Sequence, residues 1–180
     1  MEKVPRHAQP RLVLILKTPL TQLNAAPAEE FVRRLGGIFE HSPWVAEKAV
    51  ASRPYPSVDS LHQAMVRVVQ QAGEKAHLDL INAHPDLVGK AVLTAESASE
   101  QASAGLTNLS PEEVRKFREW NQAYREKFGF PFIICARLNK KDAILAAFPK
   151  RLTQDRKTEI TTALEEIAKI ARLRLEDAVT

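Results

Sequence analysis

One histidine in the chain has surroundings that favour chemistry. His84 lies in the run Ala83-His84-Pro85-Asp86-Leu87, and its proline should end the preceding helix, because proline pushes the residue before it out of the helical region. The imidazole would then lie at a helix C-terminus, where the dipole favours the protonated form, so we expect a pKa near neutrality and suited to proton transfer. On these residues alone, a simple cap of the helix end is an equally good interpretation.

Two charged side chains are candidate partners for His84. Glu100 lies in the alanine- and serine-rich stretch 95–102, and could be a site carboxylate or an ordinary solvated helix residue. Arg137 ends an apolar run, so its guanidinium could hold a small anion or a carbonyl group, although long side chains also reach from apolar segments to water. The remaining histidines have no suggestive neighbours and are expected to be surface or packing residues: His7, His41, His62 and His77.

Other kinds of catalytic site find little support. Cys135 is the single cysteine, and its apolar surroundings should raise the pKa of its thiol and keep it unreactive. The chain has neither a Gly-x-Ser-x-Gly elbow nor a phosphate-binding glycine loop, and its six glycines leave few places for either. No metal site is expected, because zinc needs three or four grouped ligands and the chain offers no such cluster.

The composition is that of a globular chain with one core. Of the 180 residues, 44% are hydrophobic and 27% charged, and this length suits a single domain. The net charge of +4 is spread along the chain instead of forming a basic stripe, so nucleic acid is not an expected partner. The apolar patch at residues 12–16 is too short for a signal peptide or a membrane span. We therefore expect a cytoplasmic protein that does not bind membranes.

Start and stop signals, together with apolar residues at helical spacing, predict a series of helices. They lie near residues 27–38, 43–50, 57–71, 75–83, 111–128 and 153–177. The clearest start is Ser110-Pro111-Glu112-Glu113, which combines an N-cap, a proline at the first helical position and a capping-box glutamate. Residues 86–109 are the least regular stretch. The charged residues of the last helix are expected to form its solvated face.

The segment 128–137 resists the helical interpretation. It is apolar, aromatic and β-branched, with Pro131 in its middle, and alone it would be predicted to be a buried strand. No second convincing strand is present to pair with it. Its backbone N–H and C=O groups would then need other partners, and a bound ligand could supply them.

Taken together, four stretches resemble the OHCU decarboxylase family, whose members act on 2-oxo-4-hydroxy-4-carboxy-5-ureidoimidazoline. They follow the family's order, and the likeness covers about residues 20–178. The stretches are 42–47 (Ser-Pro-Trp-Val-Ala-Glu) with Arg53-Pro54, 83–87 (Ala-His-Pro-Asp-Leu), 93–97 continuing to 100–106, and 128–137. Any one of them would be weak support, but four in register are specific.

The resemblance implies an all-α fold, with a single-domain helical bundle over residues 17–180 and an extended apolar segment near 128–137 lining the site. Residues 1–16 would be an N-terminal arm of no evident role. The implied activity is a cofactor-independent decarboxylation that yields (S)-allantoin, the last step of urate degradation, and the implied assembly is a homodimer. Two other classes of protein stay open as alternatives: a helical ligand-binding protein without activity, and a basic nucleic-acid binder.

The resemblance also assigns roles by motif position. His84 corresponds to the family's catalytic histidine and Glu100 to its partner carboxylate, with no metal in the site. Residues 132–136 would supply backbone hydrogen bonds to the ring and the ureido group of the substrate. The complete set of expected substrate-binding residues is Pro85, Ser97, Ala98, Ser99, Gln101, Phe132, Ile133, Ile134, Cys135, Ala136 and Arg137.

Overall fold

The computed structural model describes residues 17–180, so the predicted N-terminal arm lies outside the described residues. This part of the chain forms nine α-helices and two short 3-10 helices, which confirms the prediction of an all-α fold. In chain order they are α1 (Leu20–Ala25), α2 (Ala28–Leu35), α3 (Trp44–Ala49), η1 (Val50–Ser52), α4 (Val58–Gln70), α5 (Glu74–Asn82), α6 (Ala95–Ser103), α7 (Pro111–Phe128), η2 (Ala136–Leu138), α8 (Lys141–Arg151) and α9 (Arg156–Ala178).

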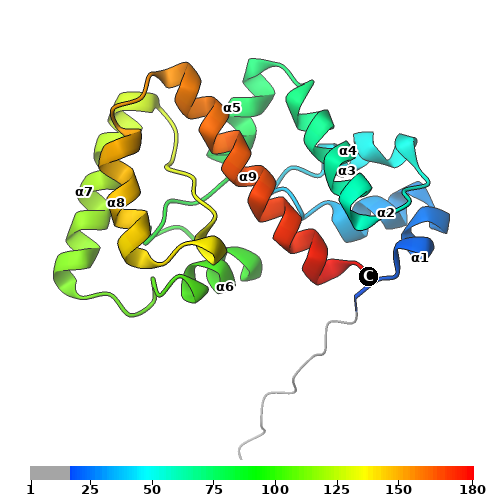
Figure 1. Ribbon diagram of the computed structural model, residues 1–180, viewed down its shortest axis with the longest axis horizontal. Helices are drawn as coiled ribbons and strands as arrows, with labels where there is room; N and C mark the ends of the chain where they lie inside the picture. The colour runs from blue at the N-terminus through cyan, green and yellow to red at the C-terminus, as the bar shows by residue number, and fades with distance from the viewer. Residues whose placement is uncertain (1–16) are drawn as a thin grey trace, which may run out of the picture.

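Helix α9 is the central element of the fold. It runs diagonally through the molecule, with α6, α7 and α8 on one side and α1 to α4 on the other (Figure 1). Its end is joined to the start of the described chain, because Thr18 N–H donates to Ala178 C=O at 2.8 Å and Thr180 N–H donates back to Thr18 C=O at 3.1 Å. Residues from both groups of helices can therefore meet on the faces of α9.

The helix starts that the sequence marks most clearly are confirmed. Ser110 caps α7 through its side chain, which accepts from Glu113 N–H, while the Glu113 carboxylate accepts from Ser110 N–H at 2.7 Å. Ser57 and Ser60 form a similar capping box at the start of α4. Each box satisfies backbone donors that a helix start leaves without partners. At its other end α7 stops at Gly129, whose φ of 80° places it in the left-handed region that glycine favours.

Three helices were not predicted. Helix α6 lies inside the stretch 86–109 that we expected to be irregular, and Thr94 caps it by accepting from Ser97 N–H at 3.2 Å. It lacks an apolar stripe, because its buried residues are the polar Ser97 and Gln101. Helix α8 contains Pro149, but this proline stands in the last turn, where few further backbone hydrogen bonds are lost. The sequence signals do not predict the short α1 either.

The segment that follows α7 is buried, and no strand pairs with it within the described residues. The ring of Phe132 stacks on Phe148 of α8 with centroids 3.8 Å apart, and meets Tyr124 of α7 edge to face at 5.2 Å. This aromatic packing fixes one side of the segment and leaves its other side toward α6 and α9.

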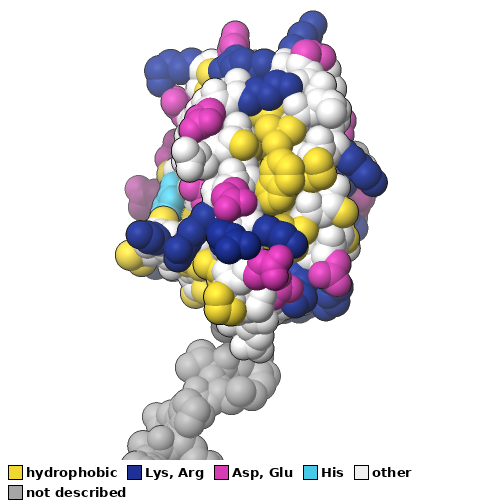
Figure 2. Space-filling view, turned by 90° about the vertical axis from the view of Figure 1, so that its left-hand side faces the viewer, with side chains coloured by type: hydrophobic (Ala, Val, Ile, Leu, Met, Phe, Trp, Pro, Cys, Tyr) yellow, Lys and Arg dark blue, Asp and Glu magenta, His cyan; other side chains and the backbone are white. Residues whose placement is uncertain are grey.

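One face of the molecule agrees with the interspersed charges of the sequence. On the face where α7 and α8 lie, basic and acidic side chains are intermingled around an apolar patch (Figure 2). None of the helices in residues 17–180 is both long enough and apolar enough to cross a membrane.

Candidate active site

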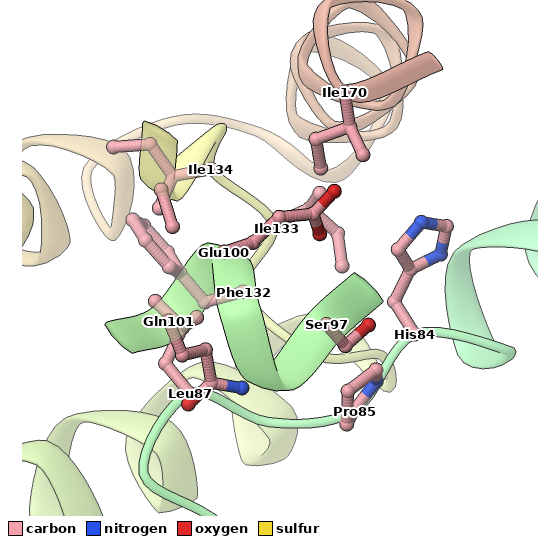
Figure 3. A pocket seen from close by; sticks show the side chains of 11 residues that line it. His84, Pro85, Leu87, Ser97, Glu100, Gln101, Phe132, Ile133, Ile134 and Ile170 are labelled. Atoms are coloured by element: carbon pink, nitrogen blue, oxygen red, sulfur yellow. The ribbon is translucent and has the colours of Figure 1, made fainter. Parts of the chain in front are cut away.

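A narrow cavity lies where the loop after α5, helix α6, the segment 132–136 and helix α9 meet (Figure 3). Nine of the residues that the sequence singled out come together here, joined by Leu87 and Ile170. The lining residues are His84, Pro85, Leu87, Ser97, Glu100, Gln101, Phe132, Ile133, Ile134, Ala136 and Ile170. The volume of about 30 Å³ has room for roughly two water molecules. Its walls therefore have to part to admit a ring-shaped ligand.

His84 lies directly after the end of α5, as predicted, and is almost completely buried with 7% of its surface exposed. Its Nδ1 is 3.0 Å from the carbonyl oxygen of Leu80. Because a carbonyl oxygen only accepts, Nδ1 must carry the hydrogen, and in the neutral ring Nε2 then carries the free lone pair. No hydrogen bond among the described residues engages Nε2, so this nitrogen is available to a ligand in the cavity.

The expected pKa of His84 is wrong. Burial disfavours the charged imidazolium and lowers the pKa to about 4, although the hydrogen bond to Leu80 and the charge of Glu40 act in the opposite direction. The field at the end of a short helix does not offset the removal of water from the ring. His84 is therefore neutral at pH 7, where it can accept a proton at Nε2 before it donates one.

Glu100 is held by an arginine and not by the histidine. Arg174, from α9, makes a two-pronged contact in which Nε donates to Glu100 Oε1 at 2.7 Å and Nη2 donates to Oε2 at 2.8 Å. Burial acts to lower the pKa of Arg174, but its bonds to Glu100 and the nearby Glu40 outweigh this and raise it. The prediction that the charged residues of α9 face solvent is wrong for Arg174, whose side chain is only 5% exposed.

A second carboxylate completes this cluster. Glu40 lies in the loop between α2 and α3, and its Oε2 atom is 2.7 Å from Nη1 of Arg174. Its carboxylate also accepts from Thr94 Oγ1 at 2.9 Å and from Ser97 Oγ at 3.1 Å. Burial acts to raise the pKa of Glu40, but the charge and contact of Arg174 and the hydroxyl of Thr94 outweigh it and lower the pKa. Sequence reasoning missed Glu40 and Arg174, and the only available signal was that Glu40 stands two residues before the stretch 42–47.

The segment 132–136 uses part of its own backbone to hold its position. Arg151 donates to the carbonyl of Ile133, and the carboxylate of Glu166 accepts from Cys135 N–H at 2.7 Å. The Cys135 carbonyl accepts from Asn139 Nδ2 at 3.0 Å. These groups are thus already engaged by the protein. The N–H groups of Phe132, Ile133, Ile134 and Ala136 take part in none of the hydrogen bonds among residues 17–180, so most donors of the expected backbone cradle stay open.

Four expected binding residues do not line the cavity. Arg137 forms an ion pair with Asp177 and, together with Ser99, lines a neighbouring wider cavity of about 640 Å³. Ala98 points to solvent on α6. Cys135 is buried, and this burial raises the pKa of its thiol. Helical periodicity explains why Ala98 and Ser99 do not line the cavity, because Ser97 and Gln101 share the inner face of α6 while Ala98 and Ser99 turn outward.

The other histidines of the described part have the structural surroundings that we expected. His62 Nε2 contacts the carbonyl of Ala168 at 2.8 Å, and His77 Nε2 contacts that of Val69 at 2.7 Å. His41 is exposed beside Glu40, and His7 lies outside the described residues. Within residues 17–180, histidine, cysteine and acidic side chains form no group of three placed as around a metal ion.

Comparison with known proteins supplies a family. The family model described as OHCU decarboxylase matches residues 24–176. Over 158 residues the chain is 46% identical to a 2-oxo-4-hydroxy-4-carboxy-5-ureidoimidazoline decarboxylase of Haloferax volcanii, covering 88% of this chain and 94% of the relative. The protein of the same name from Mus musculus is 33% identical, over 88% of this chain and 91% of its own length.

Solved structures are similar as well. A crystal structure of OHCU decarboxylase in the presence of (S)-allantoin aligns with a TM-score of 0.63 and 27% identity, over 83% of this chain and 96% of the other. A crystal structure of (S)-allantoin synthase aligns with a TM-score of 0.76 and 32% identity, over 91% of this chain. The chain spans 54% of the length of that second protein.

Proposed function

The chain belongs to the OHCU decarboxylase family, and on this premise we propose that it decarboxylates 2-oxo-4-hydroxy-4-carboxy-5-ureidoimidazoline to (S)-allantoin. It would act as a carboxy-lyase without a cofactor, in the last step of urate degradation. The observation that carries the proposal is the shared cavity, in which the free Nε2 of a neutral His84 lies across from a Glu100 carboxylate fixed by Arg174.

The substrate's own chemistry defines what the site must do. Its carboxylate and hydroxyl are on ring carbon 4, and the ureido group is on carbon 5. When CO2 leaves, the bonding electron pair stays in the ring, where a ring nitrogen takes up one proton from solvent. The hydroxyl then loses its proton to become the carbonyl of allantoin, and carbon 5 gains one on a single face. The sum is one anion and one proton converted to CO2 and allantoin.

We assign the proton transfer between the hydroxyl and carbon 5 to His84. Its Nε2 lone pair accepts the hydroxyl proton, and the imidazolium so formed returns a proton to carbon 5. A positioned acid or base of this kind typically contributes ~10²–10⁴-fold to a rate. Delivery from one wall of the cavity would determine the (S) configuration.

Binding is assigned to the remaining walls. The Glu100 carboxylate, held in a fixed orientation by Arg174, accepts a hydrogen bond from the substrate's hydroxyl or from a ring N–H. The open N–H groups of Ile133 and Ile134 donate to ring or ureido oxygens. The other residues proposed to contact the substrate are Pro85, Ser97, Gln101, Phe132 and Ala136.

The test is production of optically active allantoin. Urate is oxidised and hydrolysed by upstream enzymes, the purified chain is added at once, and circular dichroism follows the product. We expect formation well above the spontaneous rate for the wild-type chain and none above it for His84→Asn. His62→Asn is the matched control, because His62 also bonds a backbone carbonyl but lies outside the cavity. Substantial activity in His84→Asn, or none in the wild type, would overturn the proposal.

The assembly and location are also proposals. We propose a homodimer in the cytoplasm, on the family resemblance and on a chain with one cysteine. Sedimentation should give twice the mass of one chain, and a mass of one chain would contradict the dimer.

A further inference from the structure

Glu40 is the most deeply buried charged group next to the cavity that has no role in the proposed reaction. Only 2% of the surface of Glu40 is exposed, and Glu40 does not line the cavity that His84 and Glu100 share. It lines instead a second cavity of about 240 Å³, to which His84 also contributes. A carboxylate buried this far from water is costly unless its charge is paired.

The pairing of Glu40 determines where Arg174 can lie. Two nitrogens of the guanidinium, Nε and Nη2, are occupied by Glu100. The third, Nη1, faces Glu40 Oε2 at 2.7 Å, with the Gly37 carbonyl more distant at 3.4 Å. A planar guanidinium gripped along one edge by Glu100 and at its far nitrogen by Glu40 has no freedom to rotate.

Glu40 also holds the start of helix α6. The hydroxyls of Thr94 and Ser97 both donate to its carboxylate, and Thr94 is the N-cap residue of this helix. Glu100 stands one turn further along the same helix. The loop after α2 therefore fixes Glu100 by two routes, through the guanidinium of Arg174 and through the first turn of α6. Ser97 Oγ connects the two routes, because it also accepts from Arg174 Nη2 at 3.3 Å.

The charges add a second consequence. Glu40 and Glu100 together carry two negative charges against the single positive charge of Arg174, and His84 is neutral. The cluster is thus negative by one unit before a carboxylate substrate enters. Removing the charge of Glu40 makes it easier for the anionic substrate to enter, but it also loosens the Glu100 carboxylate that the substrate meets. Substrate binding should therefore not weaken, whereas kcat should fall.

We propose that Glu40 is a positioning residue of the decarboxylase, which fixes the Glu100 carboxylate through Arg174 and the first turn of α6. The expected effect on kcat rests on the proposed function, whereas the expected effect on the mobility of Arg174 does not. Glu40 touches no reacting atom, and its effect on the reaction passes through these neighbours.

Three variants test it. Glu40→Gln keeps the volume and removes the charge, Glu40→Asp keeps the charge and shortens the reach, and Glu47→Gln is the matched control because it removes an exposed glutamate from the adjacent helix α3. We expect Glu40→Gln to lower kcat by ~10²-fold, the loss typical of a misplacement of about 1 Å, without a rise in KM. Glu40→Asp should recover part of kcat, and Glu47→Gln should match the wild type.

A measurement without substrate tests the positioning role of Glu40 separately from the proposed decarboxylation. The Nε–H and Nη–H signals of Arg174 in ¹⁵N NMR, identified by their loss in Arg174→Lys, should exchange slowly with water in the wild type and at least ~10-fold faster in Glu40→Gln. If the wild type is inactive but Glu40→Gln frees these signals, the assigned reaction fails and the positioning role stands. If the wild type is active and Glu40→Gln matches it in kcat and in exchange, the role of Glu40 is refuted. A rise in KM with kcat unchanged would refute it too.

Discussion

Burial of a neutral His84 should make the free energy of unfolding depend on pH, and His84→Asn should remove that dependence. The ring is 7% exposed, and burial lowers its pKa from 6.5 to about 4. Asparagine can still donate to the Leu80 carbonyl that Nδ1 contacts at 3.0 Å, but it does not titrate. The comparison therefore isolates the protonation of one side chain.

The direction of this pH dependence follows from proton binding by His84 in the unfolded and the folded chain. In the unfolded chain His84 binds a proton below pH 6.5, whereas in the folded chain it does so only below about pH 4. The stability that comes from keeping the ring neutral is complete above pH 6.5 and is lost progressively as the pH falls toward 4. One pH unit in this window corresponds to ~1.4 kcal/mol. Between pH 7 and pH 5 the wild type should therefore lose ~2 kcal/mol more than His84→Asn.

Urea unfolding followed by far-UV circular dichroism at pH 7, 6 and 5 measures this directly. The midpoint of the wild type should fall relative to that of the variant as the pH is lowered, with equal slopes for both proteins. A difference between the two proteins that is the same at pH 7 and pH 5 would refute the reasoning. It would also remove the basis for His84 as the group that accepts the substrate's proton.

Three further predictions concern the groups around the cavity. Arg174→Lys should lower kcat by ~10²-fold, because an ammonium cannot make the two-pronged contact with Glu100; unchanged allantoin formation would exclude a positioning role for the guanidinium. Arg151→Ala should reduce the free energy of unfolding by ~3–5 kcal/mol, since it leaves the fully buried Glu159 without its cation. Replacing both Arg151 and Glu159 with methionine should reduce the free energy of unfolding by less. An equal or larger reduction in the double variant would contradict the charge argument. Cys135 should react with a thiol reagent such as DTNB only after unfolding, because it is buried and burial raises the pKa of its thiol; rapid reaction of the folded chain would show the segment to be open.

The buried ion pair of Arg151 and Glu159 shows how the fold supports the cavity from a distance. Arg151 donates to the carbonyl of Ile133 and lies over the ring of Phe132 at 4.5 Å. Its charge is balanced by Glu159 from the first turn of α9. One wall of the cavity is thereby attached to the same helix that supplies Arg174.

Capping and proline signals in the sequence predict helix ends correctly because the hydrogen bonds and steric contacts behind them are local. The capping box at Ser110 joins residues three apart, and the proline after His84 acts on its immediate neighbour. The segment 128–137 is predicted to be apolar and extended for the same reason, which holds for residues 131–135, while Phe128 ends α7 and Ala136 begins η2. Its lack of a partner strand indicates that it faces something other than a sheet. The family resemblance then joined stretches that the local signals could not connect.

Helix α6 escaped prediction because its inner face is polar. Ser97 and Gln101 are buried there, and Gln101 accepts from Val88 N–H at 3.1 Å. A stripe of apolar residues is the signal that a sequence offers for a buried helix face, and this helix has none. Its buried side is stabilised by hydrogen bonds to distant parts of the chain.

The sequence alone predicted the all-α class, the main helix ends and the family, and it proposed His84 and Glu100 as site residues, which line one cavity in the structure. The tertiary structure alone decided that His84 is neutral and that Glu100 faces Arg174, with Glu40 behind it. Glu40 and Arg174 are separated by most of the chain and look like ordinary surface charges in sequence. The protonation of a buried group depends on how much water it loses and which charges it meets, and both follow from the packing of helices that are distant in sequence.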